Sequence, residues 1–473
     1  MQRPATSSSD VGLLAALADA QPRPFWLDDP ARPEPRPALV GEEEADLVVV
    51  GGGYSGLWTA LLAKEDDPDR DVVLVESHTV GWAASGRNGG FCSASLTHKF
   101  GNRLTRFEPK LATLVSLGEA NLAGIESSLD RYGIDAEFER TGELSVAVAD
   151  WQVDELREVP EVARRYGQET EWLDRDEIQS EVHSPTYLGA LRSDDCALVH
   201  PAKLAWGLAA AAASLGVRIH ENTAATGLRT DGAGVRVRTG YGSLRARQVA
   251  LATNVFPSLL RRVRPYVVPV YDYVLATEPL TSDQLASIGW KSRAGIGDSA
   301  NQFHYYRLTA DNRVVWGGYD AVYHYGNGLR PELDQRPETF AMLAAHFRET
   351  FPQLDGVRFS HAWGGAIDTC TRFCPFWATG HGGRVGYVGG YTGLGVGATR
   401  FGARVLLDVL AGRRNELTAL DLVRSRPLPF PPEPLRWLGI EATRRSLDRA
   451  DRSDGRRNLW LRALDRLGLG FDS

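Results

Sequence analysis

The stretch ADLVVVGGGYSGLWTALLA, residues 45–63, carries the clearest structural signal in the sequence. An apolar run at 47–50 has the composition of a buried strand, and residues 55–64 have the composition of a helix. The glycines between them follow the pattern G-x-G-x-x-G: Gly51, Gly53 and Gly56. In a strand–turn–helix unit the first glycine permits a tight turn, the second lets backbone approach a pyrophosphate, and the third lets the helix pack on the strand. The order therefore predicts a dinucleotide-binding βαβ unit.

A second apolar strand at 72–75 ends at Glu76, which lies 20 residues beyond Gly56. A carboxylate at this place can accept hydrogen bonds from a ribose 2′-hydroxyl, and it repels a 2′-phosphate, which argues against NADP. The alternative is a glycine turn followed by an unrelated acidic residue. Because strand, turn, helix and acid occur in the required order, we favour the nucleotide site.

Composition limits the class of protein. The 473 residues are 43% hydrophobic and carry a net charge of −7, so we expect a globular chain of two or three domains with no nucleic-acid partner. Four cysteines are too few for a disulfide framework and lack the second pair of a zinc site; we expect reduced thiols, no metal and a cytoplasmic protein. The longest apolar segment, 204–217, has 14 residues, which predicts a buried helix and no membrane span.

Two further glycine segments follow the same logic. Residues 81–90 come directly after the second strand and combine small residues with polar side chains, which suits a segment running along a diphosphate and under a flat ring. Residues 386–397 precede a predicted helix at 400–411. A simple helix cap is the alternative for this last segment. Two glycine-to-helix transitions at opposite ends of one chain favour a long cofactor that spans a domain.

Together with the motifs at 45–63 and 81–90, six other stretches carry a resemblance to a known family: VVLVES (72–77), ALVHPAKLAWGLAAAA (197–212), VALATN (249–254), YYRLTADNRVVWGG (305–318), WGGAIDT (363–369) and YVGGYTGLGVGATRFGARVLLDVL (387–410). The chain resembles the D-amino-acid oxidase-like superfamily of FAD enzymes, which includes glycine oxidase, sarcosine oxidase and gamma-glutamylputrescine oxidase. The last motifs most resemble the gamma-glutamylputrescine oxidase branch. The resemblance implies an α/β fold: a Rossmann-like FAD-binding domain with an interleaved antiparallel-sheet substrate domain.

We expect the following division of the chain: an N-terminal arm at 1–40, an FAD-binding domain from 41–100, 195–260 and 355–423, a substrate domain from 101–194 and 261–354, and a C-terminal extension at 424–473. The extension is Pro-rich and then Arg-rich and amphipathic. Solvated packing or a subunit contact is the expected use of such a segment, so an oligomer through the extension is possible.

The resemblance also implies which residues contact FAD. The phosphate end would be met by Gly51, Gly53, Tyr54, Ser55, Gly56, Glu76 and Ser77; the diphosphate and ring by Ala84, Ser85, Arg87, Asn88, Gly89, Gly90 and Gly365; the adenosine half by the strand residue Ala225 and by Thr253 and Asn254; and the pyrimidine edge of the ring by Gly390, Thr392, Gly393, Leu394, Gly395 and Val396. The flavin should be non-covalent, since Arg87 stands where a histidyl linkage would need His.

The reaction implied is transfer of hydride from a carbon next to nitrogen to flavin N5, followed by hydrolysis of the imine and reoxidation of the flavin by O₂ to give H₂O₂. Substrate placement is expected from Tyr305, Arg307, Trp363 and Tyr391, with Arg307 as a possible carboxylate clamp. Solvent pairing of Arg307 and core packing of Trp363 are the alternatives.

Two departures from the family pattern bear on the substrate. Ile367 occupies the place of the arginine that binds the substrate carboxylate in glycine-oxidase-like enzymes, which favours an amine or an N-substituted substrate over a simple amino acid. The strand at 313–318 lacks the lysine that promotes reaction with oxygen in sarcosine-oxidase-like enzymes. An FAD-dependent amine dehydrogenase with another acceptor, a nicotinamide-only dehydrogenase and a non-catalytic flavin-binding protein therefore remain as alternatives.

Overall fold

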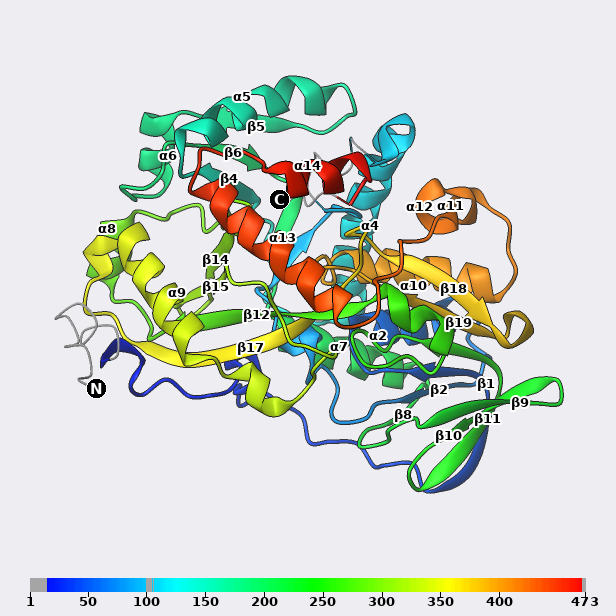
Figure 1. Cartoon of the computed structure of the whole chain (residues 1–473). Helices are drawn as coiled ribbons and strands as arrows, with labels where there is room; N and C mark the ends of the chain where they lie inside the picture. The colour runs from blue at the N-terminus through cyan, green and yellow to red at the C-terminus, as the bar shows by residue number, and fades with distance from the viewer. Residues whose placement is uncertain (1–14, 99–103, 105, 470–473) are drawn as a thin grey trace, which may run out of the picture.

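The computed structural model describes residues 15–98, 104 and 106–469, and it is built around two large β-sheets (Figure 1). The first 14 residues of the predicted arm lie outside the described part of the chain. A small antiparallel pair, β3 (Phe91–Ser93) with β7 (Cys196–Leu198), accompanies the two sheets. In the described part of the chain, every helix is either too short or too polar to cross a membrane.

The first sheet forms around the predicted strand at 47–50. Strand β1 (Gly41–Val50) lies between β2 (Val72–Val75) and β11 (Gly242–Leu251) and is parallel to both. The order continues with β8 (Arg218–His220) beyond β2 and with β19 (Val385–Gly389) and β18 (Phe376–Gly380) beyond β11, while β10 (Gly234–Arg238) and β9 (Gly227–Asp231) extend from β11. The inner strands are apolar because both of their faces are covered.

Three helices pack together on this sheet. Helix α2 (Tyr54–Asp66) lies between α7 (Pro201–Ser214) and α10 (Ala398–Leu410), so that the two predicted glycine-to-helix transitions meet although they are more than 300 residues apart. Nearly all of α2 is buried. Helix α4 (Leu111–Tyr132) packs against α10.

The second sheet is mainly antiparallel. Its order is β16 (Val322–Tyr323), β12 (Val268–Thr277), β15 (Val314–Gly318), β14 (His304–Leu308), β13 (Gly295–Asp298), β4 (Glu143–Ala147), β6 (Gly189–Ser193) and β5 (Thr170–Leu173), with β17 (Phe359–Thr369) paired to β12. Its helices are α5 (Asp150–Arg164), α6 (Arg175–Glu181), α8 (Ser282–Ile288) and α9 (Pro337–Thr350). Stacked aromatic rings such as Tyr306 and Trp316, with centroids 4.3 Å apart, fill the core between α9 and the sheet.

Two details of the prediction are wrong. The segment 355–423 was expected in the FAD-binding domain, but β17 pairs along its length with β12 and so belongs to the second sheet. The sequence of a single strand does not reveal which sheet it joins. Ala225 was expected in a strand, but it lies in the loop that precedes β9.

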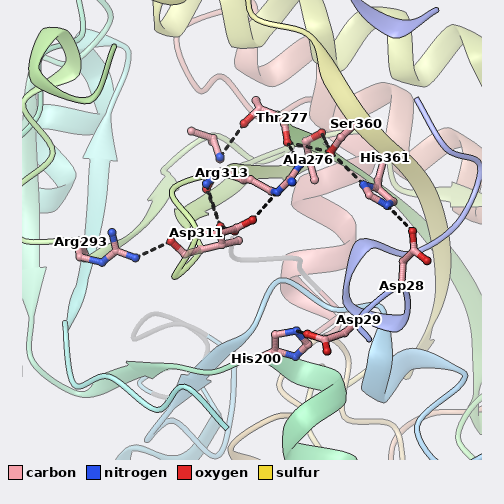
Figure 2. Close-up of polar contacts among 12 residues, drawn as sticks. Asp28, Asp29, His200, Ala276, Thr277, Arg293, Asp311, Arg313, Ser360 and His361 are labelled. Carbon is pink, nitrogen blue, oxygen red and sulfur yellow. Dashed lines mark hydrogen bonds and ion pairs between the residues drawn. The ribbon is translucent and has the colours of Figure 1, made fainter. Parts of the chain in front are cut away.

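The N-terminal arm joins the two halves of the molecule. Figure 2 shows that Asp28 points toward His361 on β17 and that Asp29 points toward His200, the N-cap of α7; the carboxylate oxygens lie 3.1 and 3.4 Å from the imidazole Nε2 atoms. Between them, the short helix η1 (Phe25–Leu27) buries Trp26, whose indole N–H donates to the carbonyl of Asn88 at 2.8 Å. The arm therefore contacts β17, α7 and the second glycine segment at once.

The C-terminal extension packs on its own chain. It follows α11 (Glu416–Ala419) and α12 (Asp421–Arg424) and contains α13 (Leu435–Asp451) and α14 (Leu459–Arg466). In Figure 1, α13 crosses the molecule beside the second sheet, and it contacts β16. An oligomer formed through the extension stays a prediction.

Candidate functional site

A cavity of about 1230 Å³ is lined by elements of both sheets. Its walls include the three glycine segments, strands β12, β14 and β17, and the C-terminal extension. Segments that lie far apart in the sequence therefore meet around this cavity.

The first glycine segment leads into α2 with backbone that only glycine allows. Gly51 has φ of +115°, and a Cβ added to Gly56 would overlap the carbonyl oxygen of Gly51. The N-cap of α2 is Gly53, which offers no side chain to the first N–H groups of the helix. Of this segment, Gly53, Tyr54 and Ser55 line the cavity. A helix N-terminus whose N-cap residue has no side chain suits an anionic phosphate.

Glu76 organises the turn beside that helix. Its Oε2 accepts from the N–H of Gly52 at 2.6 Å, and its Oε1 accepts from Ser77 Oγ, the His78 N–H and the Trp82 indole N–H, each at 2.9 Å. Neither Glu76 nor Ser77 lines the cavity. The carboxylate is buried and fixed, with acceptor capacity remaining on Oε2 for a hydroxyl.

The second glycine segment is held from several sides. Ser85 Oγ accepts from the N–H of Tyr54 at 3.0 Å, and the Asn88 side chain bonds the backbone of its own loop at Ala84 and Gly90. The Arg87 guanidinium pairs with Asp334 and donates to the carbonyls of Trp82 and Gly364, both at 3.0 Å. The cavity is lined by Ala84, Ser85, Arg87, Asn88 and Gly89, whereas Gly90 lies behind it.

The third glycine segment is shaped by a buried carboxylate. Asp368 Oδ2 accepts from the N–H of Gly390 at 2.7 Å, and burial raises the pKa of Asp368 to about 6 although N–H groups of residues 390–392 oppose the rise. The Tyr391 hydroxyl lies 3.0 Å from Ser55 Oγ and so joins the third segment to α2. The cavity is lined by Gly365, Tyr391, Thr392, Gly393, Leu394, Gly395 and Val396, with Gly390 behind them.

Beyond β11, two polar side chains lack protein partners. Thr253 Oγ1 and Asn254 Oδ1 are buried with no hydrogen-bond partner among the described residues, and Asn254 lines the cavity with φ of +48°. Ala225 does not line it. Glycine positions that exclude a Cβ, a helix that begins at a glycine N-cap and buried polar atoms without a protein partner together fit a long dinucleotide such as FAD.

A carboxylate and a phenol lie together on the cavity wall. The Tyr305 hydroxyl donates to Asp272 Oδ2 at 2.5 Å, while Asp272 Oδ1 accepts from the N–H of Tyr273 at 2.9 Å. Strand β15 separates the two residues, and Gly317 permits the contact because a Cβ there would lie 2.7 Å from the Tyr305 hydroxyl. Burial raises the pKa of Asp272 to about 6, and burial together with the charge of Asp272 raises the pKa of Tyr305 well above its usual value.

Two residues predicted to place the substrate lie outside the cavity lining. Arg307 is 2% exposed, donates to the carbonyls of Val199 at 2.7 Å and Leu308 at 3.1 Å, and stacks over Trp26. Trp363 is fully buried and donates its indole N–H to the carbonyl of Arg87 at 2.9 Å. Of the four predicted residues, only Tyr305 and Tyr391 line the cavity.

Sequence reasoning missed Asp272 and the whole contribution of the C-terminal extension. A signal for Asp272 was present, since it is the one acidic residue in the otherwise apolar and aromatic run VPVYDYVLAT at 268–277. An acid in a strand of that kind indicates a functional group or a buried pair. The extension gave no such signal because an amphipathic helix does not reveal which surface it covers.

Comparisons with known proteins agree with this geometry. The chain is similar to gamma-glutamylputrescine oxidoreductase of Escherichia coli K12, at 34% identity over 397 residues that cover 81% of this chain and 88% of that protein. It is 24% identical over 356 residues to the sarcosine oxidase beta subunit of Rhodobacter capsulatus, covering 72% and 78%. Among solved structures, glycine oxidase from Geobacillus kaustophilus shares the fold with a TM-score of 0.66 at 19% identity, over 81% of this chain and 99% of that one.

The DAO family, described as FAD dependent oxidoreductase, matches residues 46–409, which include all three glycine segments. The resemblance predicted from the motifs, the α/β fold class and the prediction of an FAD-dependent oxidoreductase are thereby confirmed. The chain belongs to the DAO family of FAD-dependent oxidoreductases.

Proposed function

We propose that this protein oxidises a carbon–nitrogen bond of an amine, with non-covalent FAD in the three glycine segments and the substrate nitrogen beside Asp272 and Tyr305. The observation that carries the proposal is this carboxylate–phenol pair, which shares the cavity wall with the segments that fit the cofactor. FAD, when bound, supplies a hydride acceptor. The names of the two relatives, a gamma-glutamylputrescine oxidoreductase and a sarcosine oxidase subunit, agree with an amine substrate.

Asp272 gives the pair its chemistry. Its Oδ2 accepts a hydrogen bond from the Tyr305 hydroxyl and has a further lone pair for an N–H of the substrate. A carboxylate with a pKa near 6 is ionised at neutral pH, so it attracts an ammonium group and takes part in removing its proton. The Tyr305 phenol remains protonated, since its pKa is raised, and it holds the carboxylate in one orientation. An amine in its neutral form is the one that gives up hydride.

The rest of the cavity also favours a cationic substrate. Position 367 presents Ile to the cavity and no cation. Four arginines line the cavity, and each is held by partners in the protein. Arg87 pairs with Asp334, Arg444 with Asp320 and Glu441, and Arg457 with Asp465, while Arg436 donates to Asn327 Oδ1 and the Pro431 carbonyl. Further carboxylates line the cavity, among them Glu119, Glu143, Glu155 and Asp195. Negative potential of this kind raises the local concentration of a cation.

The electron acceptor is the second part of the proposal. We propose O₂, with H₂O₂ as its product. Strand β15, where the lysine is absent, is buried and apolar, so the chain offers no charged group from this strand to assist the oxygen reaction. An electron acceptor other than O₂ is therefore the alternative, and the substrate assay must distinguish it from O₂.

A substrate panel tests the proposal. Purified protein, loaded with FAD, should show flavin absorption that bleaches anaerobically with primary or secondary amines and that is lost from the protein on denaturation. The same panel is then followed in air by H₂O₂ formation and without air by an artificial electron acceptor. Bleaching without peroxide would identify a dehydrogenase; retained FAD with no bleaching by any amine or amino acid would contradict the proposed oxidation.

A further inference from the structure

The C-terminal extension lies outside the part of the chain shared with the family. The family match ends at residue 409, and the glycine oxidase structure aligns over almost its entire length while leaving about a fifth of this chain unmatched. Nevertheless, residues of α13 and α14 line the same cavity as the cofactor segments. Part of the cavity lining in this chain therefore comes from outside the residues that the family match covers.

Helix α13 presents one face to the cavity. The lining positions lie on one side of the helix, at spacings of three and four residues: Leu435, Arg436, Gly439, Ile440, Thr443, Arg444 and Leu447. The neighbouring Leu438 does not line the cavity. Regular spacing on one face distinguishes a wall from incidental contact.

Polar contacts attach this wall to loops that line the cavity themselves. Asp451, at the end of α13, accepts from the Asn301 N–H at 2.9 Å, the Asn301 side-chain amide at 2.7 Å and the Gln302 N–H at 3.0 Å. Arg444 lies 3.3 Å from Asp320, a buried carboxylate that also pairs with Arg336. Both attachments are made to the second sheet, beyond β13 and β15, and they fix the distance between the helix and that sheet.

We infer that α13 is the outer wall of the substrate site and a specificity determinant that limits the length and bulk of the amine. The inference rests on the proposed amine oxidation. Gly439 is the most informative position, because a Cβ added there would meet no atom within 4 Å although the residue lines the cavity. The space above Gly439 is thus available to the part of the substrate remote from its reacting nitrogen.

Filling that space tests the inference. Gly439→Leu, in the FAD-loaded full-length protein, should lower kcat/KM by about tenfold or more for the longest amines that the wild type accepts. Turnover of the shortest amine should stay unchanged, and so should FAD content. Leu438→Phe adds bulk one residue away but outside the cavity, and it should alter neither. Equal effects of Gly439→Leu on short and long amines, or no effect on either, would overturn the inference.

Loosening the attachment gives an independent test. In Asp451→Asn an amide replaces the carboxylate, so the Gln302 N–H loses its acceptor or faces an NH₂ group. Helix α13 should then be held less firmly, and the ratio of kcat/KM for short amines to kcat/KM for bulky amines should decrease by about fivefold. Asp454→Asn makes the same chemical change at an exposed site and should leave the preference as it is. If Asp451→Asn retains the wild-type preference, α13 is not held as a specificity wall by this contact and the inference fails.

Binding without turnover separates this inference from the proposed function. Non-reacting tertiary-alkyl amines of increasing size, titrated while the flavin absorption spectrum is recorded, measure fit to the cavity directly. Weaker binding of the large members to Gly439→Leu alone supports the wall even if no amine is oxidised. Oxidation of amines by the wild type with identical size dependence in all variants would contradict the wall and leave the proposed function intact.

Discussion

At the scale of single residues, two carboxylates in mainly apolar strands distinguish the candidate site. The half-buried Asp272 and the buried Asp368 both have a pKa that is raised to about 6, yet their partners differ. Asp368 is surrounded by backbone N–H groups of the third glycine segment and shapes that loop. Asp272 accepts from one phenol and from backbone N–H groups. Both carboxylates line the cavity, but Asp368 is buried whereas Asp272 is half-buried, so Asp272 is the more accessible of the two to a substrate.

Asp272→Asn should lower kcat/KM by about tenfold to a hundredfold, because the amide cannot attract the ammonium or take its proton. In the wild type, kcat/KM should rise with pH as Asp272 ionises near pH 6. The variant should lose this limb of the profile while keeping any limb due to the substrate amine. The measurement is kcat/KM from pH 5 to 9 with one amine.

The control is Asp311→Asn, which removes a half-exposed carboxylate that pairs with Arg313 in a turn. It should leave the limb near pH 6 in place. Persistence of that limb in Asp272→Asn would show that another group controls the titration.

At the scale of elements, local sequence signals account for where the helices around the three glycine segments begin. Helices α2, α7 and α10 begin within three residues of where their sequence signals predict, since Pro201, Gly53 and the 386–397 segment each mark a helix start. Strand β17 was misassigned because pairing partners are chosen by tertiary contacts. Arg307 shows the same limit: alternation along β14 placed it with Tyr305 on one face, but the segment around Gly90 and Val199 covers that part of the face.

Gly56→Ala should prevent normal docking of α2 on β1. The added methyl group would overlap the Gly51 carbonyl oxygen, and backbone cannot move aside without opening the turn. We expect a large loss of bound FAD and a lower melting temperature, measured by flavin absorbance per protein and by circular dichroism. Gly240→Ala is the matched change at a glycine with free space around it, and it should behave as wild type. Full FAD content in Gly56→Ala would contradict the close approach of helix and strand.

At the scale of the whole molecule, the arm and the extension attach the second sheet to the first. The arm does so through two carboxylate–imidazole contacts, Asp28 with His361 and Asp29 with His200 (Figure 2). Burial lowers the pKa of His200 from 6.5 to about 4, so the folded protein holds this ring neutral. Its role as the N-cap of α7, accepting from the Lys203 N–H at 3.2 Å, also requires an unprotonated Nδ1.

The sign of the resulting pH dependence follows from linkage. Between pH 6.5 and pH 4 the unfolded chain binds a proton at His200 that the folded protein does not, so the free energy of unfolding decreases as pH falls. The full depression corresponds to about 3 kcal/mol. His200→Asn retains a capping acceptor and cannot titrate, so its melting temperature should fall less than that of wild type between pH 7 and pH 4.5.

Scanning calorimetry of both proteins over this pH range is the measurement. Parallel decreases in melting temperature would assign the acid sensitivity to other groups. A smaller slope in His200→Asn, with equal stability at pH 7.5, would assign it to the imidazole beneath the arm.

The sequence by itself determined the cofactor-binding half of this protein. Gly51, Gly53 and Gly56 meet steric requirements of one short strand–turn–helix segment, so these requirements are visible as a fixed spacing along the chain. Only the tertiary structure decided the substrate side. Asp272 and Tyr305 come from strands separated by β15, and their contact requires the space above Gly317. Helix α13 shows the same principle at larger scale: its amphipathic pattern predicts that one face packs on the protein, but tertiary packing alone decides that this face lines the cavity that the glycine segments also line.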